Sequence, residues 1–292
     1  MSNADFRPRR SVLYMPSSNE RALEKAKTIA ADGIIFDLED AVAPDAKPEA
    51  RVAAAAAVQS GEYGRRELII RVNGIGTEWH DEDIAVAAKA GPDVVLVPKV
   101  NSAEEVQQLV AALEAAGAPE KTKLWAMVET PIGMLNALSI ATASPRLTGF
   151  VMGTNDLVKE LYAEHVPGRQ PVITGLGLAL LAARAAGIVI IDGVYNDVKN
   201  AEGFAAEVEQ GRQMGFDGKT LIHPGQVEPA NSGFAPSEKA VEDAKGLIEA
   251  FEASTGGVVT YNGRMVENLH VESAKRTLAI AEAIAALAEG TA

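Results

Sequence analysis

Two acidic side chains of this sequence stand where neighbouring apolar runs end. Glu129 directly follows Lys123–Val128, and Asp156 lies four residues beyond Leu147–Met152. Two carboxylates, completed by water and substrate oxygens, are a common way to hold Mg²⁺, which takes hard oxygen ligands. The pair therefore predicts a site for Mg²⁺ or Mn²⁺. The alternative is that one of the two caps a loop or pairs with Arg71.

Basic side chains end two other apolar runs. Arg71 closes the run Ile69-Ile70-Arg71, and Lys99 follows Val97-Pro98. A planar guanidinium suits bidentate binding of a substrate carboxylate or enolate. Because a buried charge needs a partner, a structural ion pair of Arg71 with Glu39 or Asp40 is the alternative. Lys99 poses the same choice between substrate and ion pair.

Three carboxylates stand within four residues at the end of another run, namely Asp37, Glu39 and Asp40. Strand alternation puts Asp37 and Glu39 on one face and Asp40 nearer the loop. Like charges so close raise pKa values unless a cation lies among them. We expect one of the three to bind substrate, and Asp40 is the candidate. At least one of the three is expected to be a solvated loop charge.

A glycine turn precedes Asp156 and adds a further candidate. Gly153-Thr154-Asn155 could present backbone N–H groups to a carboxylate, so Thr154 and Asn155 are candidate substrate-binding residues. The turn Pro131-Ile132-Gly133 keeps the backbone after Glu129 tight.

Eight short apolar runs, each followed by a helix-length segment, must position these residues. The runs are 11–15, 33–36, 68–71, 94–97, 123–128, 147–152, 188–191 and 219–222. The predicted helices are 19–31, 48–59, 80–90, 102–116, 134–143, 175–186, 200–214 and 236–252. Near-continuous apolar strands joined by helices are typical of a parallel sheet buried on both faces. The pattern predicts a (β/α)8 TIM barrel, whose active site lies at the carboxyl ends of the strands.

The chain continues past the eighth run, so we expect a barrel over residues 1–229 and an extension over 230–292. Residues 163–174, with Pro167, Gly168 and Pro171, are expected to form an extended loop. Residues 258–266 predict a hairpin around Asn262-Gly263, because Asn-Gly suits a type I′ turn. A final helix is expected over 273–287.

Composition excludes several classes of protein. The 292 residues carry a net charge of −13, which argues against a nucleic-acid or anionic-membrane surface. Cysteine is absent, which rules out disulfides, thiolate metal sites and a cysteine nucleophile. The four histidines form no His-x-x-x-His pair, so a zinc hydrolase is not indicated. Without a signal-like or membrane-length apolar stretch, we expect a cytoplasmic protein.

Seven short motifs occur in order along nearly the whole chain. They are Leu13-Tyr14-Met15-Pro16, Asp37-Leu38-Glu39-Asp40-Ala41-Val42, Ile70-Arg71-Val72-Asn73-Gly74, Val97-Pro98-Lys99-Val100, Glu129-Thr130-Pro131-x-Gly133, Gly153-Thr154-Asn155-Asp156-Leu157 and Leu221-Ile222-His223-Pro224. Together they resemble the citrate lyase β-subunit-like CoA-ester lyases of the HpcH/HpaI aldolase superfamily, which include malyl-CoA and citramalyl-CoA lyases.

The resemblance implies a TIM barrel, often trimeric, that breaks or forms a carbon–carbon bond beside a CoA thioester. It implies that Glu129 and Asp156 hold Mg²⁺ and that Arg71 binds substrate. It also implies that the C-terminal extension packs over a neighbouring subunit and contributes a carboxylate there. The expected activity is Mg²⁺-dependent cleavage of a 3-hydroxyacyl-CoA such as malyl-CoA to an acyl-CoA and a 2-oxo acid, with Glu267 transferring a proton.

One departure from the family pattern leaves the reaction open. The carboxylate after the hairpin is Glu267, where the family's lyases usually have aspartate. A shift near 1 Å changes which atom is attacked or protonated. Hydrolysis of (3S)-malyl-CoA to malate and CoA is therefore an alternative. A citrate lyase β-type subunit acting on an acyl-carrier protein is another, although the extension resembles that of free-standing CoA enzymes. The structural alternative for Glu267 is that it caps the final helix.

Overall fold

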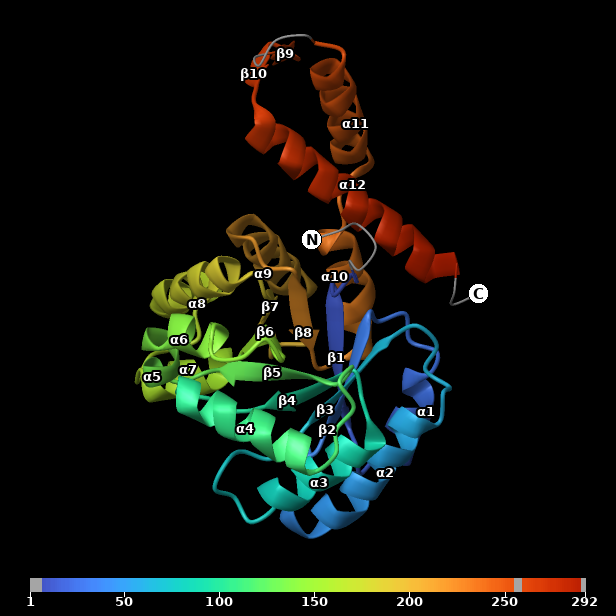
Figure 1. The fold of residues 1–292 in the computed structure, drawn as a ribbon, viewed down its shortest axis with the longest axis vertical. Coiled ribbons are helices and arrows are strands. Elements are labelled where there is room, and N and C mark those ends of the chain that lie inside the picture. The colour runs from blue at the N-terminus through green and yellow to red at the C-terminus, as the bar shows by residue number, and fades with distance from the viewer. Residues whose placement is uncertain (1–6, 255–258, 290–292) are drawn as a thin grey trace. The chain divides into compact units, whose positions relative to one another are not determined.

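Eight parallel strands form a closed barrel in the computed structural model, which describes residues 7–254 and 259–289 (Figure 1). The strands are β1 (Ser11–Pro16), β2 (Gly33–Asp37), β3 (Glu67–Arg71), β4 (Val94–Val97), β5 (Lys123–Val128), β6 (Leu147–Met152), β7 (Val189–Asp192) and β8 (Gly218–Leu221). Each strand pairs with the next in sequence, and β8 pairs with β1. The predicted TIM barrel is confirmed.

An apolar core fills the barrel interior. Its buried members come from alternate strand positions, as a period of two requires. They are Val12, Ile35, Ile69, Val94, Leu96, Trp125, Met127, Val151 and Ile191. Because the next inward position on each strand lies two residues further on, this core fixes which side chains face the carboxyl-end mouth.

Helices surround the barrel (Figure 1). They are α1 (Glu20–Ala26), α2 (Lys47–Gln59), α3 (His80–Ala90), α4 (Ala103–Ala115), α5 (Pro131–Leu135), α6 (Ala137–Ala141), α7 (Thr154–Glu160), α8 (Ile173–Ala186), α9 (Ala201–Met214) and α10 (Val227–Phe234), with 3-10 turns η2 (Pro44–Ala46), η3 (Pro167–Val172) and η4 (Pro224–Gln226).

Three local expectations differ from the structure. The single helix expected over 134–143 is two short helices, α5 and α6, because the chain leaves helical geometry at Asn136. The loop expected over 163–174 contains the 3-10 turn η3, interrupted by Gly168 and Arg169 with positive φ angles. Helix α10 was not predicted, since Pro229 and Gly233 obscure its pattern.

Among the described residues, those from Phe234 onward form a compact unit together with Arg7 and Pro8, and residues Arg9–Gly233 form a second unit. This C-terminal unit contains α11 (Glu238–Glu252), the hairpin β9 (Val259–Tyr261) and β10 (Arg264–Val266), and α12 (Asn268–Glu289). The expected hairpin is confirmed, with φ of 51° at Asn262 and 74° at Gly263, as a type I′ turn requires. Residue 258 and residues 1–6 lie outside the described part of the chain.

The last helix begins at Asn268, earlier than the expected Ser273. The reason is local, because His270 Nδ1 accepts a hydrogen bond from the Glu267 backbone N–H at 3.0 Å and closes the first turn. Over residues 7–254 and 259–289, no helix has the length and apolar character of a membrane span.

Candidate active site

Strand alternation brings the chemistry-bearing residues to the barrel mouth. Asp37, Arg71 and Glu129 each lie two positions beyond an inward core residue of their strands. Gly153 has the same relation to the inward Val151 of β6. All four positions therefore face the interior at the carboxyl end, where TIM barrels carry their active sites.

The two predicted metal ligands converge on one lysine. Glu129 is 3% exposed, and its Oε1 accepts a hydrogen bond of 2.8 Å from the backbone N–H of Lys99. The Lys99 ammonium Nζ lies 3.5 Å from Oδ1 of Asp156, which is on the first turn of α7. The structure thus brings Glu129, Asp156 and Lys99 together.

Burial and neighbouring charge raise the pKa of Glu129 from 4.5 to about 7. Removal from water is the largest cause, followed by the charges of Asp156 and Glu39, and the N–H and charge of Lys99 oppose them. A carboxyl of this kind is stabilised in its ionised form by a nearby cation.

The donor set fits Mg²⁺. Within the described residues, no group of three or more His, Asp or Glu side chains could hold a metal ion, so Glu129 and Asp156 are a two-carboxylate pair. Mg²⁺ is usually bound by one or two carboxylates with water and substrate oxygens completing the octahedron. Oxygen donors also suit Mn²⁺.

A glycine makes room for the buried carboxylate. A Cβ built on Gly153 would collide with Cβ and Oε2 of Glu129 and would lie 2.9 Å from its Cδ. Gly153 has φ −98°, which any residue adopts, so space alone restricts this position. The close approach of β6 to Glu129 therefore depends on the missing side chain.

Arg71 is held by the acidic cluster of β2. Its Nε and Nη2 each donate to Asp37 at 2.6 Å, and Nη1 lies 2.5 Å from a Glu39 oxygen and 3.8 Å from Asp40. The guanidinium also stacks over Tyr14 at 4.8 Å. The structural ion pair is confirmed, with Asp37 as its main partner, and a role in substrate binding stays a prediction.

Two of these carboxylates differ in environment. Burial raises the pKa of Glu39 to about 7, although the charge of Arg71 opposes the shift. Asp40 has a side chain that is 73% exposed and reaches Arg71 only at 3.8 Å. Asp40 is therefore the solvated member of the cluster, and its substrate role stays a prediction.

Thr154 and Asn155 lie beside the pair at the start of α7. Thr154 is buried, and its side chain packs where a Cβ on Gly193 would stand. Asn155 exchanges side-chain hydrogen bonds of 2.7 and 3.2 Å with Asn196 at the rim. Neither observation tests their predicted contact with substrate.

Glu267 lies in the C-terminal unit, between β10 and α12. Its side chain is exposed, and its backbone carbonyl accepts from the N–H of His270 at 2.9 Å. The backbone of Glu267 thus takes part in starting α12, at Asn268 rather than near Ser273. Its predicted catalytic role stays a prediction.

Lys47 was missed by the sequence reasoning. Its ammonium is buried and donates to the carbonyls of Leu38 and Glu39 and to Oδ1 of Asn73, at 2.8 to 2.9 Å. It also lies 4.8 Å over the ring of Trp79. Lys47 therefore fixes the loop that carries the partners of Arg71.

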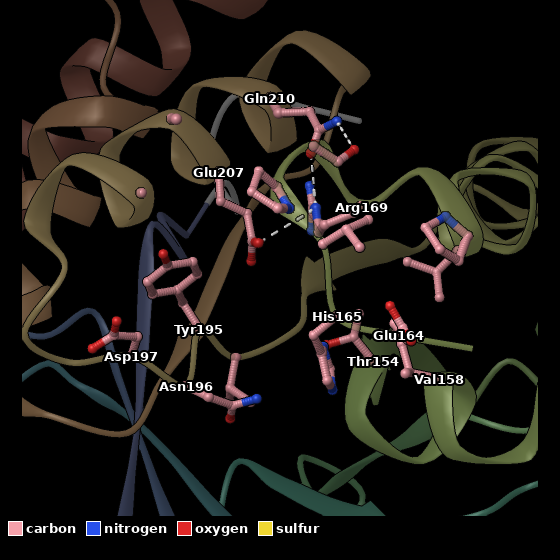
Figure 2. A pocket seen from close by; sticks show the side chains of 18 of the residues that line it. Thr154, Val158, Glu164, His165, Arg169, Tyr195, Asn196, Asp197, Glu207 and Gln210 are labelled. Atoms are coloured by element: carbon pink, nitrogen blue, oxygen red, sulfur yellow. Dashed lines mark hydrogen bonds and ion pairs between the residues drawn. The ribbon is translucent and has the colours of Figure 1, made fainter. Parts of the chain in front are cut away.

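A cavity of about 440 Å³ lies beside the mouth, between η3, α9 and the loop after β7 (Figure 2). Arg169 lines it, and its Nη1 donates to both oxygens of Asp192 at 2.7 and 2.8 Å. Lys219 contacts the same Asp192 at 3.1 Å and Glu207 at 2.7 Å. Asp192 directly follows the inward Ile191, so strand alternation turns its side chain outward. This buried ion cluster therefore lies between the barrel and its helices. Sequence spacing gave no sign of it.

Comparison with known proteins identifies the family of the chain. A family model described as HpcH/HpaI aldolase/citrate lyase matches residues 10–224, and a model of TIM-barrel C–C bond lyases matches residues 168–285. The chain is 55% identical over 282 residues to a (3S)-malyl-CoA thioesterase of Cereibacter sphaeroides, covering 96% of each chain. It is 40% identical to a citrate lyase subunit beta of Haemophilus influenzae, covering 92% of this chain and 96% of that one.

A solved structure is also similar. CitE from Mycobacterium tuberculosis, in complex with magnesium, acetoacetate and coenzyme A, superposes with a TM-score of 0.78 at 29% identity, over 96% of this chain and 99% of that one. With the family model matching most of the barrel, the protein belongs to the HpcH/HpaI aldolase/citrate lyase family of enzymes.

Proposed function

We propose that this protein is a Mg²⁺-dependent CoA-thioester hydrolase that converts (3S)-malyl-CoA to malate and CoA. The observation that carries the proposal is the 55% identity to a (3S)-malyl-CoA thioesterase over 96% of both chains. The proposal places thioester hydrolysis before carbon–carbon cleavage, which came first among the sequence-based hypotheses.

The carboxylate pair supports the metal part of the proposal. Glu129 and Asp156 hold the ion, and Gly153 gives Glu129 the space it needs. Bound there, Mg²⁺ polarises a substrate oxygen and stabilises the negative charge that develops on it.

The cations at the mouth support binding of an anionic substrate. Arg71 uses Nε and Nη2 for Asp37, which leaves Nη1 facing Glu39. Because the pKa of Glu39 is about 7, this carboxyl is often protonated near neutral pH. A substrate carboxylate can then take its place at Nη1. The half-exposed ammonium of Lys99 is the second cation on this side.

In hydrolysis, water adds to the thioester carbonyl carbon, the carbon–sulfur bond breaks, and CoA leaves as the thiol. Glu267 takes the proton of the attacking water and returns one to the sulfur. This role requires the C-terminal unit to reach a barrel mouth, and we propose that it reaches that of a neighbouring subunit in a homo-trimer or a multiple of three.

The second candidate is cleavage of malyl-CoA to acetyl-CoA and glyoxylate. The match of residues 168–285 to C–C bond lyases and the identity to citrate lyase subunit beta favour it. In that reaction Arg71 stabilises the enolate of the departing acetyl-CoA. A subunit acting on an acyl-carrier protein is the third candidate. Turnover of free malyl-CoA by the purified chain alone would argue against it.

Product analysis separates these candidates. The purified protein is incubated with (3S)-malyl-CoA and Mg²⁺, and malate and CoA are quantified beside glyoxylate and acetyl-CoA. Hydrolysis predicts stoichiometric malate and free thiol without glyoxylate. Stoichiometric glyoxylate and acetyl-CoA would contradict the proposal in favour of the lyase.

A further inference from the structure

Lys99 occupies an unusual backbone position. Its φ angle is 54°, in the left-handed region, where a residue other than glycine is strained. The conformation is fixed on both sides, because the Lys99 N–H donates to Glu129 at 2.8 Å and its carbonyl accepts from Asn101 Nδ2 at 2.9 Å. Glycine would make the same backbone hydrogen bonds without strain. The presence of lysine therefore indicates a function for its side chain.

The side chain places a cation on the candidate metal ligands. Nζ lies 3.5 Å from Oδ1 of Asp156, while the backbone of the same residue holds Glu129. A lysine ammonium is positively charged at neutral pH. A divalent cation on the same carboxylates would be repelled by a positive charge at this distance.

The Lys99 ammonium has an alternative position away from Asp156. The side chain is 45% exposed, and it also lines a cavity of about 510 Å³ with Glu39, Asp40 and Asn73. Four flexible methylene groups let the head group move from Asp156 into this cavity without any change in the backbone.

We propose that Lys99 is a displaceable counter-ion of the carboxylate pair, an inference that rests on the proposed metal-dependent function. Its ammonium neutralises Asp156 until a divalent cation binds there, and it then turns to the anionic substrate. Lys99 thereby weakens binding of the metal alone and strengthens binding of the substrate, which favours metal binding before substrate.

The test measures metal binding without substrate. Mg²⁺ affinity is determined by calorimetry, and Mn²⁺ affinity by electron paramagnetic resonance, at constant ionic strength. The variants are Lys99→Met, which removes the charge, and Lys99→Arg, which keeps it. Lys89→Met is the matched control, because it removes the same charge from the exposed far end of α3.

Removal of a unit charge this close predicts metal binding at least about tenfold tighter in Lys99→Met. Wild-type affinity is expected in Lys99→Arg and Lys89→Met. The KM for malyl-CoA should rise in Lys99→Met, opposite to the change in metal affinity. Lys99→Gly, which suits a φ of 54°, should tighten metal binding in the same way and guards against misfolding of the methionine variant.

Unchanged or weaker metal binding in both Lys99→Met and Lys99→Gly, with the wild type binding Mg²⁺, would overturn the proposal and leave the metal site intact. Failure of the wild type to bind either metal would instead refute the metal-dependent function on which the proposal rests.

Discussion

Gly153→Ala should disable the metal site through one added methyl group. The new Cβ would lie 2.9 Å from Cδ of Glu129 and would collide with its Cβ and Oε2. Carbon atoms prefer separations of about 3.5–4.0 Å, so the carboxyl must move by roughly 1 Å. Such a movement breaks the 2.8 Å hydrogen bond from Lys99 to Glu129.

The size of the effect follows from this geometry. Overpacking of a buried contact costs about 1–3 kcal/mol of stability. Loss of the position of one of two carboxylates should weaken Mg²⁺ binding by about 10–100-fold, the range for lost support of a metal ligand. Urea unfolding measures the first quantity and calorimetric Mg²⁺ titration measures the second.

Gly177→Ala is the matched control for this prediction. Gly177 lies within α8, and a Cβ there would meet nothing within 4 Å. Alanine in the helix interior should stabilise the protein by up to about 1 kcal/mol and leave Mg²⁺ affinity unchanged. Wild-type Mg²⁺ affinity in a folded Gly153→Ala protein would refute the assignment of Glu129 as a metal ligand.

Three further predictions concern charge and assembly. The pKa of Glu129 is raised to about 7, and a metal ligand must be ionised. Mg²⁺ affinity should therefore rise with pH up to about 7 and level off above it. Equal affinities at pH 6 and pH 8, measured by calorimetry, would contradict this. Arg71→Met leaves Asp37 buried without its cation and should lower the free energy of unfolding by about 3–5 kcal/mol in urea titrations. A loss below about 1 kcal/mol would show that the ion pair is not needed for stability. Mixing inactive Glu267→Gln and Asp156→Ala proteins should restore partial activity after subunit exchange if two subunits share each site. No recovery of activity in demonstrably mixed oligomers would place Glu267 in its own subunit's site or outside catalysis.

The barrel could be predicted from sequence because its strands are short and mostly apolar. Val94–Val97 and Lys123–Val128 were predicted with the bounds that the structure gives. Since parallel strands end at one rim, the positions of Glu129 and Asp156 also followed. Helices α5 and α6 did not, because the bend at Asn136 has no sequence signal as strong as proline or glycine.

The partners within the site depend on register, which the sequence does not contain. Arg71 pairs with Glu39, as expected, but its main partner Asp37 was not foreseen. The register of β2 and β3 aligns Asp37 opposite Arg71. Lys47 stands in a polar stretch that looks solvated, and it is buried because three acceptors converge on it. The left-handed backbone of Lys99 is equally invisible in Val97-Pro98-Lys99, since proline restricts the residue before it rather than the one after.

Isotopic labelling tests the central claim most directly. The protein turns over (3S)-malyl-CoA with Mg²⁺ in water enriched in oxygen-18, and the malate is analysed by mass spectrometry. Thioester hydrolysis predicts one oxygen-18 atom in the carboxylate that carried CoA. Products of carbon–carbon cleavage, with glyoxylate accumulating and no labelled malate, would contradict the account.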